Sequence, residues 1–272
     1  MIFSFIALLT GTFVDLFIIM LIVLLHEFGH YVAANYYKWR IQSIDLWVFG
    51  GVMKTDEYGS KSIREELIVT LAGPFQHIII YLILGLFSFQ SIISHSLIDL
   101  IFYYNSVILL FNLLPIWPLD GGKIVCILNN LFIPYRLAYE RTIIFSMVVC
   151  LGLIAGQLFF LPFNLSSLII MIFLLMENRS GWQQRYYVFM RFLLHRYEKH
   201  FSDYPRTPIV VKGNIRLIDL FKKFHQGKRH LIHIPGVNHR ETIIVDELDC
   251  LRFYFEDKYY SQPVNELVSK YT

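Results

Sequence analysis

The sequence predicts a polytopic α-helical membrane protein that ends in a small α+β domain. Of its 272 residues, 56% are hydrophobic and only 17% are charged, whereas a soluble domain has roughly a quarter charged residues. Long apolar segments fill the chain up to Glu177, and 16 of the 24 lysine and arginine residues follow it. We therefore expect a transmembrane domain over 1–177, a linker helix over 178–204 and a cytosolic domain over 205–272.

The apolar segments predict about six spans. A spanning helix needs about 20 mostly apolar residues, and the opening run, residues 1–12, is shorter than this and is counted as a sixth span. The five segments that qualify or come close are 13–37, 66–89, 97–117, 142–162 and 164–177.

The distribution of positive charge predicts the orientation. The connections near residue 11, at 88–98 and at 161–165 contain no lysine or arginine, and all 24 of these residues lie elsewhere. By the positive-inside rule, the charged side is cytosolic. Six spans then place both termini in the cytosol.

Residues 178–200 alternate basic and aromatic side chains. One interpretation is a helix along the lipid headgroups, with its aromatic residues at the interface. The other is a linker helix packed on the next domain. The sequence leaves both open.

From Pro205 the pattern predicts a strand (PIVVK), a helix (IRLIDLFKKFHQG), two strands (HLIHIPG and TIIVD) and a short helix near 246–255. From Asn178 onward there are 16 basic and 10 acidic residues. This balance favours a membrane surface or an acidic partner, while the lack of a recognised motif argues against a nucleic-acid partner.

The segment LLHEFGHYVAANYY, residues 24–37, places His26, Glu27 and His30 within an apolar run. Histidines four residues apart project from one helix face and can bind one ion, and the glutamate beside them can accept a proton from a water. An interfacial or core role is the alternative. However, each ionisable group at membrane depth costs about 2.5–3.5 kcal/mol, and a zinc site explains all three.

A thiolate zinc site or a disulfide scaffold does not fit three widely spaced cysteines: Cys126, Cys150 and Cys250.

A catalytic zinc ion needs a third protein ligand, and Asp120 in NLLPIWPLDGGK, residues 112–123, is the candidate. Irregular backbone at membrane depth occurs where it is buried in protein or lines a cavity. The prolines and glycines here predict a loop that turns the Asp120 carboxylate towards His26 and His30. A helix-ending turn with the aspartate as a cap is the alternative. The residues that predict the loop are Pro115, Pro118, Gly121 and Gly122.

Two further polar residues lie in apolar segments. Asn112 could bind a substrate backbone or the developing oxyanion, or it could be an amide that joins two helices. His77 could lie behind a metal ligand or gate the site, although a hydrogen bond between helices is the preferred interpretation.

The two motifs, HEFGH in one span and N-x-x-P-x-x-P-L-D-G-G in a later one, resemble those of the site-2 protease family of intramembrane zinc metalloproteases. The sequence is most similar to the family's sporulation branch, with LAGPFQH at 71–77 and the C-terminal domain included in the resemblance. The resemblance implies that His26, His30 and Asp120 are zinc ligands and that Glu27 is the catalytic base.

The resemblance also implies roles outside the ligands. Asn112 matches an asparagine close to the active site, and 42–57 resembles a membrane-associated β hairpin beside it. Its edge, with Gly50 and Gly51, could pair with an unwound substrate strand; an ordinary cytosolic hairpin is the alternative. The C-terminal domain resembles a CBS domain, which implies ATP sensing and a homo-oligomeric partner.

By resemblance, the expected substrate is a membrane-associated sigma-factor precursor, cleaved during sporulation in the mother-cell membrane around the forespore. Membrane inhibitory or regulatory proteins of the sporulation complex are the other expected partners. Two alternatives belong to other classes: a metal transporter, which would have no need of Glu27, and an inactive membrane adaptor, against which the intact motifs argue.

Overall fold

A computed structural model describes residues 13–47, 50–55, 57–88, 94–159, 164–199, 204–235, 242–260 and 262–264. The chain divides into two compact units, which are described separately. The membrane unit comprises residues 1–58, 64–125 and 146–177, and the C-terminal unit comprises 59–63, 126–145 and 178–272. The predicted short span over 1–12 lies outside the described residues.

The membrane unit begins with helix α2, Phe13–Tyr36. The helix ends where Lys38 adopts a left-handed conformation with φ 55°. Strands β1, Ile41–Trp47, and β2, Gly50–Thr55, follow as an antiparallel pair in which Leu46 faces Gly51 and Trp47 faces Gly50. The hairpin expected over 42–57 is therefore present, with residues 48, 49 and 56 outside the described part.

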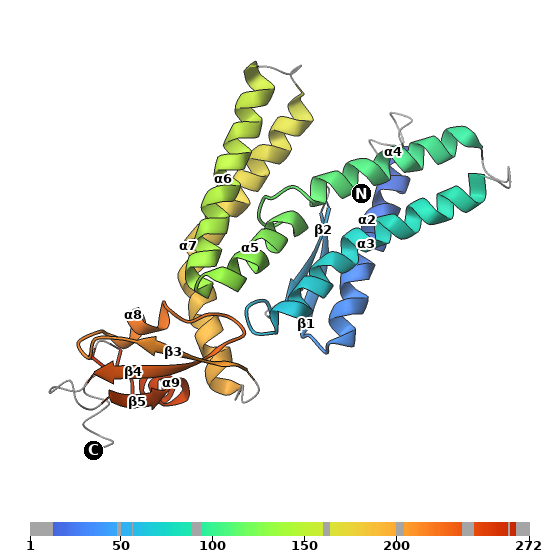
Figure 1. The fold of residues 1–272 in the computed structure, drawn as a ribbon. Coiled ribbons are helices and arrows are strands. Elements are labelled where there is room, and N and C mark those ends of the chain that lie inside the picture. The colour runs from blue at the N-terminus through green and yellow to red at the C-terminus, as the bar shows by residue number, and fades with distance from the viewer. Residues whose placement is uncertain are drawn as a thin grey trace. The chain divides into compact units, whose positions relative to one another are not determined.

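Helices α3, Ile63–Ser88, and α4, His95–Asn112, complete the first half of the membrane unit (Figure 1). Apolar side chains of α2 and α3 pack with those of α4 in one core cluster, which includes Ile22 and Leu84. Burial of this shared face, rather than helix propensity alone, holds such helices together.

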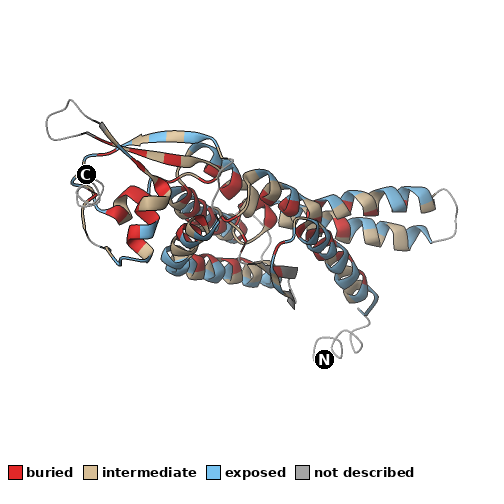
Figure 2. Ribbon diagram, turned by 90° about the horizontal axis from the view of Figure 1, so that it is seen from below, coloured by how far each residue is buried: buried red, intermediate tan, exposed pale blue. Residues whose placement is uncertain are grey.

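The second half of this unit contains the beginning of α5, Asp120–Phe132, and parts of α6, Tyr135–Phe159, and α7, Leu165–Glu198. Cys150 and Leu174 pack around the fully buried Ile116. Among the described helices, α2, α3 and α6 are long and apolar enough to cross a membrane. Large apolar side chains are also exposed on these helices, and Figure 2 shows exposed positions along the outer faces of the helices. Lipid contact accounts for such a surface.

The C-terminal unit contains a three-stranded sheet and two short helices. Strand β4, Arg229–Pro235, lies between the parallel β3, Arg206–Val210, and the antiparallel β5, Thr242–Asp246 (Figure 1). Helix α8, Leu217–Phe221, follows β3, and α9, Glu247–Phe255, follows β5. This is the order of strands and helices that the sequence predicted from Pro205 onward.

Helix α7 is continuous through the composition change at Asn178. Its later turns bury Phe189, Phe192 and Leu193 in the core of the C-terminal unit, against side chains of the sheet and of α8 and α9. The interpretation of this segment as a linker helix packed on the next domain therefore fits the structure.

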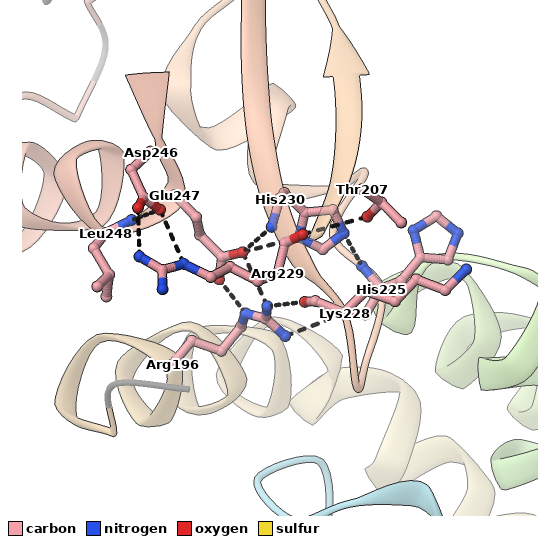
Figure 3. Close-up of polar contacts among 9 residues, drawn as sticks. All are labelled: Arg196, Thr207, His225, Lys228, Arg229, His230, Asp246, Glu247 and Leu248. Carbon is pink, nitrogen blue, oxygen red and sulfur yellow. Dashed lines mark hydrogen bonds and ion pairs between the residues drawn. The ribbon is translucent and has the colours of Figure 1, made fainter. Parts of the chain in front are cut away.

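A buried charged cluster ties α7 to the sheet (Figure 3). The Arg196 guanidinium donates hydrogen bonds to both carboxylate oxygens of Glu247 and to the backbone carbonyls of His225 and Lys228. Glu247 Oε2 also accepts from the backbone N–H and from Nδ1 of His230, each at 2.9 Å. Each charge in this cluster has its counterpart within the protein.

Candidate metal centre

Three side chains from two helices meet in the interior of the membrane unit. His26 and His30 lie one turn apart on α2, and Asp120 is the first residue of α5. The Nε2 atoms of the two histidines are 3.1 Å apart, and Asp120 Oδ2 lies 3.0 Å from the first and 3.1 Å from the second. All three residues are at most 3% exposed.

The turn before α5 brings Asp120 to this position. Residues 113–119 form turns rather than helix, as the prolines predicted. However, Gly121 and Gly122 lie in the first turn of α5, and the interpretation of both as loop residues was wrong. A Cβ on Gly121 would lie 2.3 Å from the carbonyl oxygen of Leu113, and one on Gly122 would lie 2.5 Å from that of Ile116. The two glycines therefore let the start of the helix pack directly on the preceding turn.

The separations fit a single zinc ion. Three atoms that bind zinc tetrahedrally at about 2.0–2.1 Å are about 3.3–3.4 Å apart, close to the distances between these ligand atoms. The chemistry of the atoms agrees, because the Nδ1 atom of His30 lies 2.8 Å from the carbonyl oxygen of Val69. A carbonyl only accepts, so His30 Nδ1 carries the proton and Nε2 presents its lone pair to a metal.

Helix α3 lies directly against the two histidines. A Cβ on Gly73 would lie 2.3 Å from Nε2 of His30 and 2.7 Å from Nε2 of His26. Only a residue without a side chain can occupy this position while both ring nitrogens stay where they are. The LAGPFQH segment, singled out from the sequence, thus forms one wall of the site.

Glu27 lies beside His26 and His30. It is 6% exposed, and its Oε2 atom has no hydrogen-bond partner in the described part of the chain. One oxygen of Glu27 lies within 4.8 Å of ring nitrogens of both His26 and His30. A buried carboxylate oxygen without a hydrogen-bond partner costs free energy of folding. Its presence therefore calls for an explanation, such as a ligand or a catalytic role. This position suits a proton acceptor for a water at the metal.

The structure adds a residue to which the sequence had assigned no role. Lys123, one turn after Asp120 on α5, places Nζ 3.2 Å from Asp120 Oδ1. The Lys123 ammonium thereby pairs with Oδ1 of Asp120, whereas Oδ2 faces the histidines and stays available to a metal. Its position three residues after Asp120 was the available signal, since that spacing places both side chains on one helix face.

His77 on α3 lies behind the first ligand. Its Nε2 atom is 3.0 Å from Nδ1 of His26, and its Nδ1 atom is 2.7 Å from Oδ1 of Asn105 on α4. His77 thus contacts His26 and also joins α3 to α4. The position behind a candidate ligand and the hydrogen bond between helices, both considered from the sequence, are therefore both present. The sequence had not singled out Asn105.

The residues expected to contact substrate are not joined to the ligand cluster by hydrogen bonds among the described residues. The Asn112 amide donates to the carbonyl of Ile108 on its own helix, at 3.1 Å. Gly50 and Gly51 begin strand β2. Their roles towards a substrate stay predictions.

Known proteins resemble this chain in sequence and in fold. The model of peptidase family M50 matches residues 14–94. The chain is 34% identical over 265 residues to stage IV sporulation protein FB of Bacillus subtilis, and this alignment covers 97% of the chain and 92% of that protein. It is also 35% identical over 114 residues to a zinc metalloprotease of Methanocaldococcus jannaschii, which covers 40% of the chain and 33% of that protein.

Among solved structures, the site-2 protease from Methanocaldococcus jannaschii superimposes with a TM-score of 0.50. The match covers 61% of this chain and 76% of that one at 24% sequence identity. This likeness concerns the fold.

Proposed function

The chain belongs to the site-2 protease family of intramembrane zinc metalloproteases, and we propose that it cleaves a membrane-associated sigma-factor precursor during sporulation. It is a zinc metalloendopeptidase, and cleavage would release the active transcription factor. The observation that carries the proposed chemistry is the unpartnered Glu27 carboxylate oxygen beside three converging ligand atoms.

In this proposal His26, His30 and Asp120 hold the zinc ion. Zinc at this position would supply Lewis-acid polarisation of the scissile carbonyl and would acidify a water. Glu27 accepts the proton of the attacking water and passes it to the leaving amine. Lys123 fixes the Asp120 carboxylate through its second oxygen. The buried surroundings strengthen these electrostatic interactions because they exclude bulk water.

The substrate must be extended at the bond to be cut, since helical hydrogen bonds shield backbone carbonyls. We place the unwound segment along the edge of the β1–β2 hairpin at Gly50 and Gly51, where backbone groups can pair with an added strand. Asn112, in the last turn of α4, would bind the substrate backbone or the oxyanion. Both assignments follow from the resemblance.

Six spans with both termini in the cytosol are part of the proposal, in the mother-cell membrane that surrounds the forespore. Support comes from the lysine and arginine residues, which are absent from the connections assigned to the opposite side. The described helices α2, α3 and α6 account for three of these spans.

We further propose that the C-terminal domain is CBS-like and senses ATP, and that it pairs with a second copy or with regulatory membrane proteins. Its strand–helix–strand–strand–helix order supports the first part. Within the C-terminal unit, Gln226 accepts from Asn130 of α5 at 2.9 Å and donates to the carbonyl of Lys61 at 3.1 Å. The helix that Gln226 contacts is the one that begins at Asp120.

The test is co-expression of a membrane-tethered sigma-factor precursor with the wild-type protein, with Glu27→Gln and with Glu177→Gln, the last a control at an exposed carboxylate of the membrane unit. Zinc content is measured on each purified protein. We expect zinc in all three and cleavage by all except Glu27→Gln. Cleavage by Glu27→Gln at the wild-type rate would overturn the assignment of the base. If the wild-type protein contains zinc and the precursor stays intact, the proposal that this precursor is the substrate is overturned.

A further inference from the structure

A chain of three hydrogen bonds runs from a ligand into the helix interface behind it. His26 contacts His77 through Nδ1 and Nε2 at 3.0 Å, and His77 contacts Asn105 through Nδ1 and Oδ1 at 2.7 Å. The Asn105 amide nitrogen lies 3.2 Å from the backbone carbonyl oxygen of His77. His77 and Asn105 are fully buried.

The backbone carbonyl at the end of this chain fixes every proton in it. The His77 carbonyl accepts only, so the Asn105 group facing it must be the NH₂ group. Asn105 Oδ1 therefore faces His77 Nδ1, which must carry a proton to donate. In the neutral His77 ring Nε2 is then an acceptor, and His26 Nδ1 is the donor to it. The result is a neutral His26 whose Nε2 lone pair is free.

We propose that His77 and Asn105 are positioning residues that hold His26 in the tautomer and ring orientation required for zinc binding. The inference rests on the metal centre of the proposed function and is independent of its substrate. An outer partner of this kind fixes the tautomer and raises the basicity of the ligand. The two histidine ligands differ here, because a backbone carbonyl orients His30 whereas two side chains orient His26. Substitution of His77 or Asn105 can therefore change the zinc affinity, whereas the backbone carbonyl that orients His30 cannot be removed by substitution of a side chain.

A purely structural role makes a different prediction. His77 and Asn105 join α3 to α4, and so do Tyr81 and Ser106, whose hydroxyls lie 2.8 Å apart about one turn further along α3. Tyr81→Phe removes a bond between the same two helices without a contact to a ligand. If His77 acted only by joining helices, its loss and the loss of the Tyr81 hydroxyl would have similar consequences for zinc.

The experiment measures the affinity of the purified, detergent-solubilised full chain for Zn²⁺ by competition with a chromophoric chelator. Limited proteolysis monitors the fold in parallel. We expect His77→Leu to bind Zn²⁺ about 10–100-fold more weakly than wild type, and Tyr81→Phe to stay within about twofold. His77→Gln should recover affinity to within about threefold, because its side-chain carbonyl can accept the His26 proton.

Equal Zn²⁺ affinities for His77→Leu and Tyr81→Phe, with both folds intact, would overturn the inference. If His77→Leu does not fold, the comparison of His77→Gln with Asn105→Ala decides. Asn105→Ala should then bind more weakly than His77→Gln by at least about threefold, and the reverse order would refute the proposal. Failure of the wild type itself to bind Zn²⁺ would instead contradict the metal centre, and failure to cleave the precursor would concern only the substrate.

Discussion

The membrane unit and the C-terminal unit each bury a cluster of histidine and acidic side chains, and the two clusters differ in how their charges are balanced. Around Glu247 in the C-terminal unit, the acceptors face donors: an arginine, a histidine N–H and a backbone N–H. Around Asp120 in the membrane unit, three acceptor atoms face one another at 3.0–3.1 Å.

The C-terminal cluster is closed. The backbone N–H of His225 donates to Nε2 of His230, at 3.2 Å, which leaves the proton of that ring on Nδ1 for Glu247. His230 is thus neutral, and the one positive and one negative charge cancel. Such a cluster has no coordination position to offer and serves to join α7 to the sheet.

The membrane cluster is open. With both Nδ1 atoms protonated, the Nε2 atoms of His26 and His30 and the Oδ2 atom of Asp120 all present lone pairs to one point. Lone pairs at this separation repel one another unless a cation lies among them. The positions of the protons, rather than burial or residue type, therefore distinguish the proposed metal site from the structural ion cluster.

The largest effect is expected where α3 packs against the two histidines proposed as zinc ligands. Gly73→Ala would place a methyl group 2.3 Å from Nε2 of His30 and 2.7 Å from Nε2 of His26. Because two ligands must move at once, we expect zinc affinity to fall by about a thousandfold, beyond the 10–100-fold typical of outer-shell changes. Zn²⁺ competition on the full chain measures it.

Gly85→Ala is the matched control on the same helix. There an added Cβ meets no heavy atom within 4 Å in the described part of the chain. It should leave zinc affinity unchanged and stabilise the helix by about 0.5–1 kcal/mol. Similar zinc affinities for the two variants would contradict the open geometry of the membrane cluster.

The residues of the open cluster could be singled out from the sequence because they follow short spacings. Two histidines four residues apart on an apolar helix require an explanation within that helix, and an aspartate after a proline-rich turn supplies a ligand. The closed cluster could not be predicted. Arg196 and Glu247 are 51 residues apart, and neither occurs in a pattern that indicates a partner.

Two differences in the fold have physical causes. The Gly-Gly pair after Asp120 predicted a loop, but contacts with the backbone of the preceding turn favour a helix there in spite of low glycine propensity. At Asn178 the composition changes while α7 continues, since the composition of a segment reports its surroundings and not the end of a helix. Asn105 was missed because an amide in an apolar span has many possible partners.

Breaking the closed cluster should affect stability and not zinc. Glu247→Ala leaves the buried Arg196 charge without its partner, and removal of one member of a buried pair costs about 3–5 kcal/mol. Native-state hydrogen exchange of β4 and α9 amides measures the loss within the full chain. Arg252→Ala is the control, because its bond to Glu256 at 3.2 Å is exposed and should contribute little to stability. Loss of zinc from Glu247→Ala would show that the two clusters are not independent.

Acid should weaken the closed cluster in two steps. Burial lowers the pKa of His230 below its usual 6.5, with the hydrogen bond to Glu247 offsetting part of this. Burial alone would raise the pKa of Glu247, but the His230 hydrogen bond and the Arg196 charge outweigh it and lower the pKa from 4.5 to about 2. In both cases the unfolded state binds the proton first, so stability falls as the pH falls.

The first loss should therefore begin below about pH 6.5 and the second below about pH 4.5. The second step amounts to about 3 kcal/mol between pH 4.5 and 2, at about 1.4 kcal/mol per pKa unit. Hydrogen exchange of β4 amides across this range measures both steps. Glu247→Gln should be less stable than wild type at pH 7 yet lose less on acidification, because its side chain does not titrate. Parallel pH profiles for the two proteins would mean that the Glu247 carboxylate is not held ionised by Arg196 and His230, and the contrast between a closed and an open cluster would fail.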